Sequence, residues 1–136
     1  MRKLWRGIDY KLYILYNEEG KLTPRKQYLH KDKEMLFFAE SFSSAASYAI
    51  KFAKPTVLEF DFTNDDWYFY EIKQINIIPF YYYTERSMST NMIKRLYTLK
   101  KSEEIKKLVN SMMFNTVCEV RNRNKYWDLK ELNVEY

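Results

Sequence analysis

The chain has 136 residues, of which 46% are hydrophobic, 18% aromatic and 30% charged, and its formal net charge is +5. A chain of this length buries one core, so we expect residues 1–136 to form a single domain, and the many aromatic side chains argue against disorder. With two glycines, one cysteine and one histidine, the sequence excludes a Gly-rich phosphate loop, a disulfide framework and a zinc site of Cys and His ligands.

The beginning of the sequence carries charge but little apolar character. The first six residues, MRKLWR, are followed by no apolar run long enough for a signal peptide or a membrane span. The lone Cys118 fits a reducing compartment. We therefore expect a cytoplasmic protein that has no membrane partner and needs no metal.

The first third of the chain is predicted to hold one strand and a long connection. A strand over residues 3–8 ends near Gly7, and residues 10–16 fit either a strand or a helical turn before the Asn-Glu-Glu-Gly cluster. Residues 21–34, rich in charge, are expected to cross the surface as an exposed connection, with His30 solvated in it.

Residues 34–62 give the clearest signal, which is strand, helix, strand. The run 35–38 is apolar, and the helix that follows has Ser41 or Ser43 as its N-cap. Its apolar face recurs at helical spacing, at Phe42, Ala45, Ala46, Ala49, Ile50 and Ala53. Over residues 57–62 the period changes to two, so Leu58, Phe60 and Phe62 are predicted to face the core while Glu59 and Asp61 face solvent.

The second half of the chain is predicted to continue with strands, two helices and a closing hairpin. A turn at residues 63–66 precedes two strands, and two amphipathic helices then precede two final strands. The strands are expected over residues 67–72, 75–84, 114–120 and 126–134, and the helices over residues 86–100 and 102–113. This order predicts an α+β fold of mainly antiparallel strands, in one or two small sheets with about three helices.

Two short motifs resemble a known enzyme family. Leu4-Trp5-Arg6-Gly7 is similar to the aromatic-Arg-Gly motif on the first strand of ADP-ribosyltransferase exoenzymes, and residues 37–41, FFAES, occupy the place of their aromatic-Ser-Thr-Ser strand end. Residues 43–49 resemble the family's next helix, and residues 57–62 resemble the strand after it. The similarity covers roughly residues 1–62, apart from residues 9–34.

The resemblance implies an enzyme that binds NAD and transfers ADP-ribose to a protein or nucleic-acid acceptor. It implies that Arg6, followed by Gly7, holds a phosphate through its bidentate fork, and that Ser41 helps to hold the nicotinamide ribose. It also implies a late-strand carboxylate that stabilises the cation left when nicotinamide departs, for which Glu119 is the candidate. Phe38 or Tyr48 could stack on the nicotinamide ring.

The sequence departs from the family pattern at several of these positions. Ala39 stands where the family has its first motif serine, and Ser41 has a competing role as a helix cap. The Glu-x-Glu pair of many transferring members is absent at Glu119. Glu59-Phe60-Asp61 has a similar spacing but is expected to be an ordinary solvent face. Arg6 has the alternative interpretation of a charged residue on an exposed strand face.

Two functions from other classes stay open. Residues 1–34 and 85–109 each carry a net charge of +4, whereas residues 55–72 hold five acidic residues and no basic one. A basic, Tyr-rich domain of this kind could bind nucleic acid. Alternatively, the chain is a small inhibitor or adaptor that binds a partner protein without catalysis, of the kind that phages and mobile elements encode.

Overall fold

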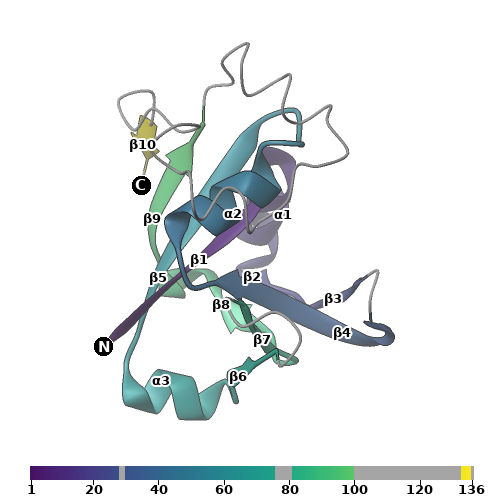
Figure 1. Cartoon of the computed structure of the whole chain (residues 1–136), viewed down its shortest axis with the longest axis vertical. Helices are drawn as coiled ribbons and strands as arrows, with labels where there is room; N and C mark the ends of the chain where they lie inside the picture. The colour runs from purple at the N-terminus through teal and green to yellow at the C-terminus, as the bar shows by residue number, and fades with distance from the viewer. Residues whose placement is uncertain (28–29, 76–80, 100–132, 136) are drawn as a thin grey trace.

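An eight-stranded antiparallel sheet organises the part of the chain that the structure, a computed structural model, describes: residues 1–27, 30–75, 81–99 and 133–135. The strand order is β10-β9-β5-β1-β4-β7-β6, and β3 pairs with β4 (Figure 1). The strands of this sheet are β1 (Arg2–Asp9), β3 (Arg25–Gln27), β4 (His30–Ala39), β5 (Pro55–Phe62), β6 (Lys73–Gln74), β7 (Tyr81–Thr84), β9 (Ile93–Thr98) and β10 (Asn133–Glu135).

The described residues also form a smaller two-stranded ribbon and four short helical segments. The ribbon consists of β2 (Lys21–Leu22) and β8 (Met88–Ser89). The helical segments are α1 (Tyr10–Glu19), α2 (Phe42–Ala49), α3 (Asn64–Phe69) and the 3₁₀ helix η1 (Thr90–Met92). The predicted α+β fold with mainly antiparallel strands is confirmed.

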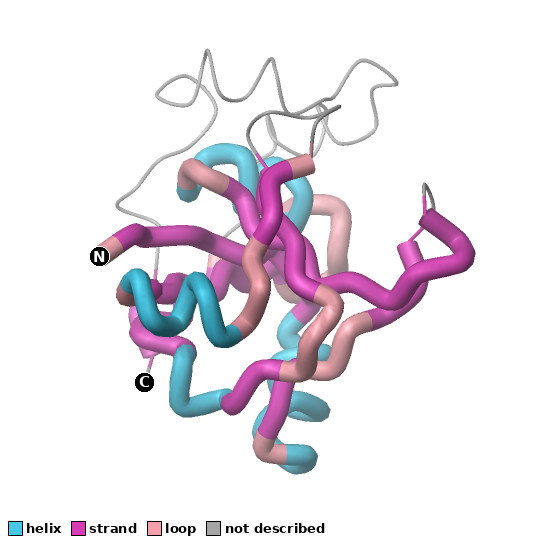
Figure 2. Tube along the Cα trace, turned by 90° about the horizontal axis from the view of Figure 1, so that it is seen from below, coloured by secondary structure: helices cyan, strands magenta, loops and turns pink. Residues whose placement is uncertain are grey.

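The sheet is covered on both faces. Helix α2 lies across β1 and β5 on one face (Figure 1), and its alanines pack there against Val57 and Leu99. The other face holds the larger core, in which Leu4, Phe38 and Phe60 pack with residues of α1, β2 and β8. The outer part of β4 projects from the body together with β3 (Figure 2). Because α2 and the larger core lie on opposite faces, β5 carries buried residues on both of its faces, whereas β1 alternates buried residues on the core side with half-buried residues on the side of α2.

The strand, helix and strand predicted within residues 34–62 are confirmed as β4, α2 and β5. Ser41 is the N-cap of α2, as expected, but this helix ends at Ala49, short of the predicted Ala53. Residues 10–16, for which the sequence allowed a strand or a helical turn, belong to the helix α1. Residues 21–34, predicted as an exposed connection, instead contribute β2, β3 and the start of β4.

Three predictions in the second half of the chain are wrong. Thr63 caps a helix, and the predicted strand over residues 67–72 begins in the helix α3. The predicted helix over residues 86–100 is instead β8, η1 and β9. Lys73 and Gln74, which lie between the strands expected over residues 67–72 and 75–84, form β6. The predicted helix over 102–113 and strand over 114–120 lie outside the described residues, as does most of 126–134, of which 133 and 134 belong to β10.

Candidate functional site

The guanidinium of Arg6 is buried beside β4 and α1. The residue is 9% exposed. Its Nη1 donates to the carbonyl oxygen of Phe37 at 3.0 Å, and its Nη2 donates to the hydroxyl of Tyr16 at 3.0 Å. Arg6 therefore ties β1 to its neighbouring strand and to the following helix. The alternative expectation, an exposed charged residue, is wrong.

The hydrogen-bond acceptors around Arg6 are neutral. A guanidinium has five N–H groups and stays positively charged in proteins. Two of these groups are bonded, while Nε is buried without a partner among the described residues. None of the ion pairs in that part of the chain involves Arg6. Because an unpaired buried charge is costly, an anion that reaches this side chain would be bound favourably.

Gly7 allows α2 to lie directly on β1. A Cβ atom at this position would be 2.1 Å from the carbonyl oxygen of Ala45 and 3.2 Å from the Cβ of Ala49. Only a residue without a side chain fits under this helix. Gly7 thus has a packing role that accounts for its position next to Arg6.

Ser41 stands at the junction of β4 and α2. Its Oγ accepts a hydrogen bond from the backbone N–H of Ser44 at 3.1 Å and donates to the hydroxyl of Ser44 at 3.0 Å. Since Trp5 pairs with Ala39, Arg6 and Ser41 come from adjacent segments of the sheet. The side chain is partly exposed, so it lies within reach of a ligand at the end of β4.

The two aromatic candidates have different surroundings. Phe38 is fully buried, with edge-to-face contacts to Phe60 and Phe62. Its expected stacking on nicotinamide is therefore wrong, because the core covers the ring. Tyr48 is 43% exposed and lies against Phe52 near the end of α2. At about 1.5 Å per residue, it is about 10 Å along the helix from Ser41.

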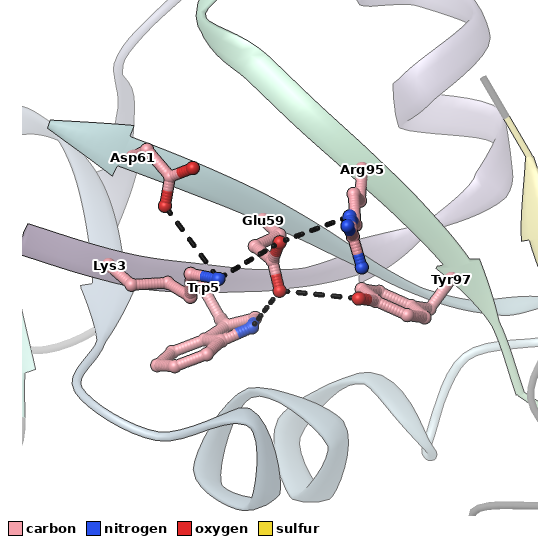
Figure 3. Close-up of polar contacts among 6 residues, drawn as sticks. All are labelled: Lys3, Trp5, Glu59, Asp61, Arg95 and Tyr97. Atoms are coloured by element: carbon pink, nitrogen blue, oxygen red, sulfur yellow. Dashed lines mark hydrogen bonds and ion pairs between the residues drawn. The ribbon is translucent and has the colours of Figure 1, made fainter.

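Glu119 lies outside the described residues. Among the residues that the structure describes, the carboxylate of Glu59 is buried. Glu59 is 5% exposed. Its Oε1 accepts hydrogen bonds from Trp5 Nε1 at 3.1 Å and from the Tyr97 hydroxyl at 3.2 Å (Figure 3). Its Oε2 lies 3.6 Å from Lys3 Nζ and 3.8 Å from Arg95 Nε. The expectation that Glu59 faces solvent is wrong.

A signal for this burial was present in the sequence. Val57 and Leu58 are consecutive apolar residues in β5, which is typical of a strand covered on both faces. Glu59 shares the face of Val57, which α2 covers. A carboxylate on this face of β5 therefore lies under α2 rather than in solvent. Asp61, one step further along the same face, is more exposed, with 24% of its side chain accessible.

The pKa of the Tyr97 phenol is raised. Burial is the main cause that raises its pKa above the ordinary value of 10.0, and the charge and hydrogen bond of Glu59 act in the same direction. The nearby Arg95 opposes this shift. The phenol therefore stays protonated beyond its usual range and continues to donate to Glu59.

Arg6 and Glu59 lie on opposite faces of the sheet. The register pairs Arg6 with Leu58 and Trp5 with Glu59. Because side chains alternate between faces along a strand, the guanidinium belongs to the side of the larger core and the carboxylate to the side of α2. The two groups do not line one cleft, so Glu59 does not replace Glu119 in the expected site.

Comparisons with family models, curated proteins and solved structures give no match for this chain. In the described ranges, no helix combines the length and the apolar character that a membrane span requires. The same ranges contain no group of three or more His, Cys, Asp and Glu side chains placed to hold a metal ion.

Proposed function

We propose that the protein binds NAD and transfers ADP-ribose to a macromolecular acceptor. One observation carries this proposal: Arg6, on the first strand, is a buried guanidinium with neutral acceptors and an unpartnered Nε. A diphosphate is an anion whose oxygens suit the planar fork of such a group. The cytoplasmic location expected from the sequence is compatible with NAD as substrate.

The contacts of Arg6 favour a prepared phosphate site. Tyr16 and Phe37 each hold one terminal nitrogen at 3.0 Å, so the side chain is oriented before a ligand arrives. Binding then costs little side-chain entropy. The order of β1, β4, α2 and β5 along the chain also agrees with the order of motifs on which the resemblance rests.

The remaining roles follow from the resemblance. Ser41, at the end of β4, would hold the nicotinamide ribose. Glu119 would stabilise the positive charge that develops as the bond between the ribose carbon and nicotinamide breaks. A nucleophile of the acceptor then forms the new bond to that carbon and releases its proton. Removal of the Glu119 charge in a Glu119→Gln variant should slow the reaction roughly 10²-fold.

The first test measures NAD binding by calorimetry and nicotinamide release with cell extract as acceptor. Arg6→Lys keeps the charge but loses the fork, so NAD affinity should fall at least about tenfold. Tyr16→Phe is the comparison variant, because it removes one of the two hydrogen bonds that orient Arg6 but keeps the charge and the fork. NAD affinity should therefore fall less in Tyr16→Phe than in Arg6→Lys.

The proposal fails if the wild-type protein neither binds NAD at millimolar concentration nor releases nicotinamide. It also fails in its site assignment if Arg6→Lys and Tyr16→Phe change NAD affinity equally, since Arg6 would then act only through the stability of the fold.

A second function, binding of a partner protein without catalysis, is favoured by α3. Tyr68 is 87% exposed and Phe69 is 65% exposed, and adjacent exposed aromatic residues are typical anchors of protein interfaces. A Tyr68→Ser, Phe69→Ser double variant should lose a partner that co-purifies with the wild-type protein. A partner retained equally by both forms would contradict this role for α3.

A further inference from the structure

The loop between α2 and β5 carries two lysines, and each ammonium lies over an aromatic ring. Lys51 Nζ is 3.8 Å from the ring centre of Tyr48 and 5.7 Å from that of Phe52. Lys54 Nζ is 3.9 Å from the ring centre of Tyr10. We call these five residues the α2–β5 patch.

Backbone contacts hold the patch together as one surface. The N–H of Tyr10 donates to the carbonyl oxygen of Lys54 at 3.0 Å, which fixes the start of α1 to the loop. The N–H of Phe52 donates to the carbonyl oxygen of Ala49 at 3.0 Å, which fixes the loop to the end of α2. The rings of Tyr48 and Phe52 are in edge contact, with centroids 5.6 Å apart.

The patch has positive charge that the described residues do not neutralise. None of the ion pairs within residues 1–27, 30–75, 81–99 and 133–135 involves Lys51 or Lys54. Burial lowers the pKa of Lys51, so its charged form pays a desolvation cost that a bound anion would offset. Glu59, the acidic residue nearest to Lys54 along the chain, already pairs with Lys3 and Arg95, and Asp9, next to Tyr10, forms no ion pair with either lysine in the described ranges. The local charge therefore favours an anionic partner.

We propose that the α2–β5 patch binds single-stranded nucleic acid. A nucleic-acid strand offers phosphates and flat bases alternately, and the patch offers ammonium groups and rings side by side. Phosphates pair with the lysines, and bases stack on Tyr48, whose 43% exposure leaves ring surface available. An acidic peptide would use the lysines alone and would leave the aromatic residues without a role.

This proposal uses neither Arg6 nor Ser41, and it gives Tyr48 a role that does not require NAD. The patch lies at the end of α2 that is remote from Ser41, and it differs from the basic segments that the sequence alone suggested. All measurements below are made without NAD, so their failure and the failure of the proposed enzymatic function are distinguishable.

The experiment measures fluorescence anisotropy of labelled single-stranded DNA and RNA of about 12 nucleotides, a length within the range of known single-strand sites. The Lys51→Gln, Lys54→Gln double variant should bind at least about tenfold more weakly. The slope of the logarithm of its binding constant against the logarithm of the salt concentration (the salt slope) should fall in magnitude by about 1.4, as expected when two phosphate contacts are lost. Lys73→Gln, which changes an exposed lysine on β6, is the matched control and should bind like the wild type.

A second variant separates nucleic acid from other polyanions. Tyr48→Leu removes the stacking surface but keeps an apolar side chain, so it should weaken oligonucleotide binding about tenfold without changing the salt slope. Binding of polyphosphate, which has no bases, should not change.

Three results would overturn the proposal. Equal oligonucleotide affinity of the wild type and the double lysine variant would remove the patch as the binding site. If Tyr48→Leu binds oligonucleotides as tightly as the wild type, or if polyglutamate competes as well as DNA, the patch is a surface for acidic proteins or polyanions in general. Thermal melts of all variants exclude loss of folding as the cause.

Discussion

Glu59 accepts hydrogen bonds from side chains of the strands on either side of it. Trp5 comes from β1 and Tyr97 from β9, and both donate to the same carboxylate oxygen. Lys3 and Arg95, each about half exposed, lie beside the other oxygen. The buried acid thus joins three strands on the face of the sheet that α2 covers.

Replacing Glu59 with Gln should destabilise the protein by about 2 kcal/mol. The amide keeps an acceptor for Trp5 and Tyr97 but loses the charge that faces Lys3 and Arg95, and hydrogen bonds to charged groups contribute more than neutral ones. Asp61→Asn is the control. Asp61 makes one ion pair, at 3.9 Å from Lys3, so this substitution should lower the free energy of unfolding by less than about 0.5 kcal/mol. Urea denaturation measures both, and equal costs would contradict the central role of Glu59.

The phenol of Tyr97 predicts a loss of stability at alkaline pH. Its folded-state pKa is raised above 10.0, chiefly by burial, so the unfolded chain loses this proton first as pH rises. The corresponding stability is fully present below about pH 10 and is lost as pH rises through the folded pKa. Denaturant titrations from about pH 9 upward should show a smaller alkaline loss for Tyr97→Phe than for the wild type. Parallel curves would mean that Tyr97 has the same pKa in both states.

Sequence patterns identified the capping role of Ser41 but not the environments of Arg6 and Glu59. A cap depends on residues within one helical turn, which a sequence window contains. The burial of Arg6 and Glu59 depends instead on which strands flank β1 and β5. Tyr16 is ten residues from Arg6, and Trp5 is fifty-four residues from Glu59, so alternation along a single strand does not reveal these partners.

At the scale of elements, the contact of α2 with β1 depends on Gly7. Gly7→Ala would bring a methyl group to 2.1 Å from the backbone oxygen of Ala45, and α2 would have to move away from the sheet. Overpacking of this kind costs about 3 kcal/mol, so we expect chemical denaturation to show a decrease of that size in the free energy of unfolding.

Gly20 provides the matched control for this substitution. Gly20 has a φ of +74° and no atom within 4 Å of an added Cβ. Gly20→Ala should therefore cost about 1 kcal/mol, because the left-handed backbone conformation is strained but no clash occurs. A larger cost at Gly20 than at Gly7 would contradict the close packing of α2.

Two elements show why local patterns misassigned the second half of the chain. Met88, Met92 and Leu96 recur every four residues, a spacing that fits a helix face and also one face of a strand. Pairing with β5 decides in favour of strand β9. Trp67 and its aromatic neighbours favour a strand by propensity, yet the capping box of Thr63 and Asp66 starts α3 at this point.

At the scale of the whole molecule, β10 protects the edge of the sheet. Asn133, Val134 and Glu135 pair with Thr98, Tyr97 and Leu96 of β9. Deletion of residues 133–136 would expose the unpaired N–H and C=O groups of β9, and such an edge promotes association between chains. Light scattering should show concentration-dependent association of the shortened protein. Deletion of residue 136 alone is the control, and equal behaviour of the two forms would contradict this role of β10.

The central position of β5 has a consequence for the order in which the sheet opens. Strand β5 pairs with β1 over its whole length and with β9 on its other side, and seven of its eight residues are buried. Its amide hydrogens lie between two paired strands and under packed layers on both faces, so they should exchange through global unfolding and be among the slowest in the protein. The two-residue strands β2 and β6 should exchange much faster through local fraying. Hydrogen exchange at β5 would then report the free energy of global unfolding without denaturant, and in the Gly7 and Glu59 variants the logarithm of the exchange rate should rise in proportion to the loss of stability.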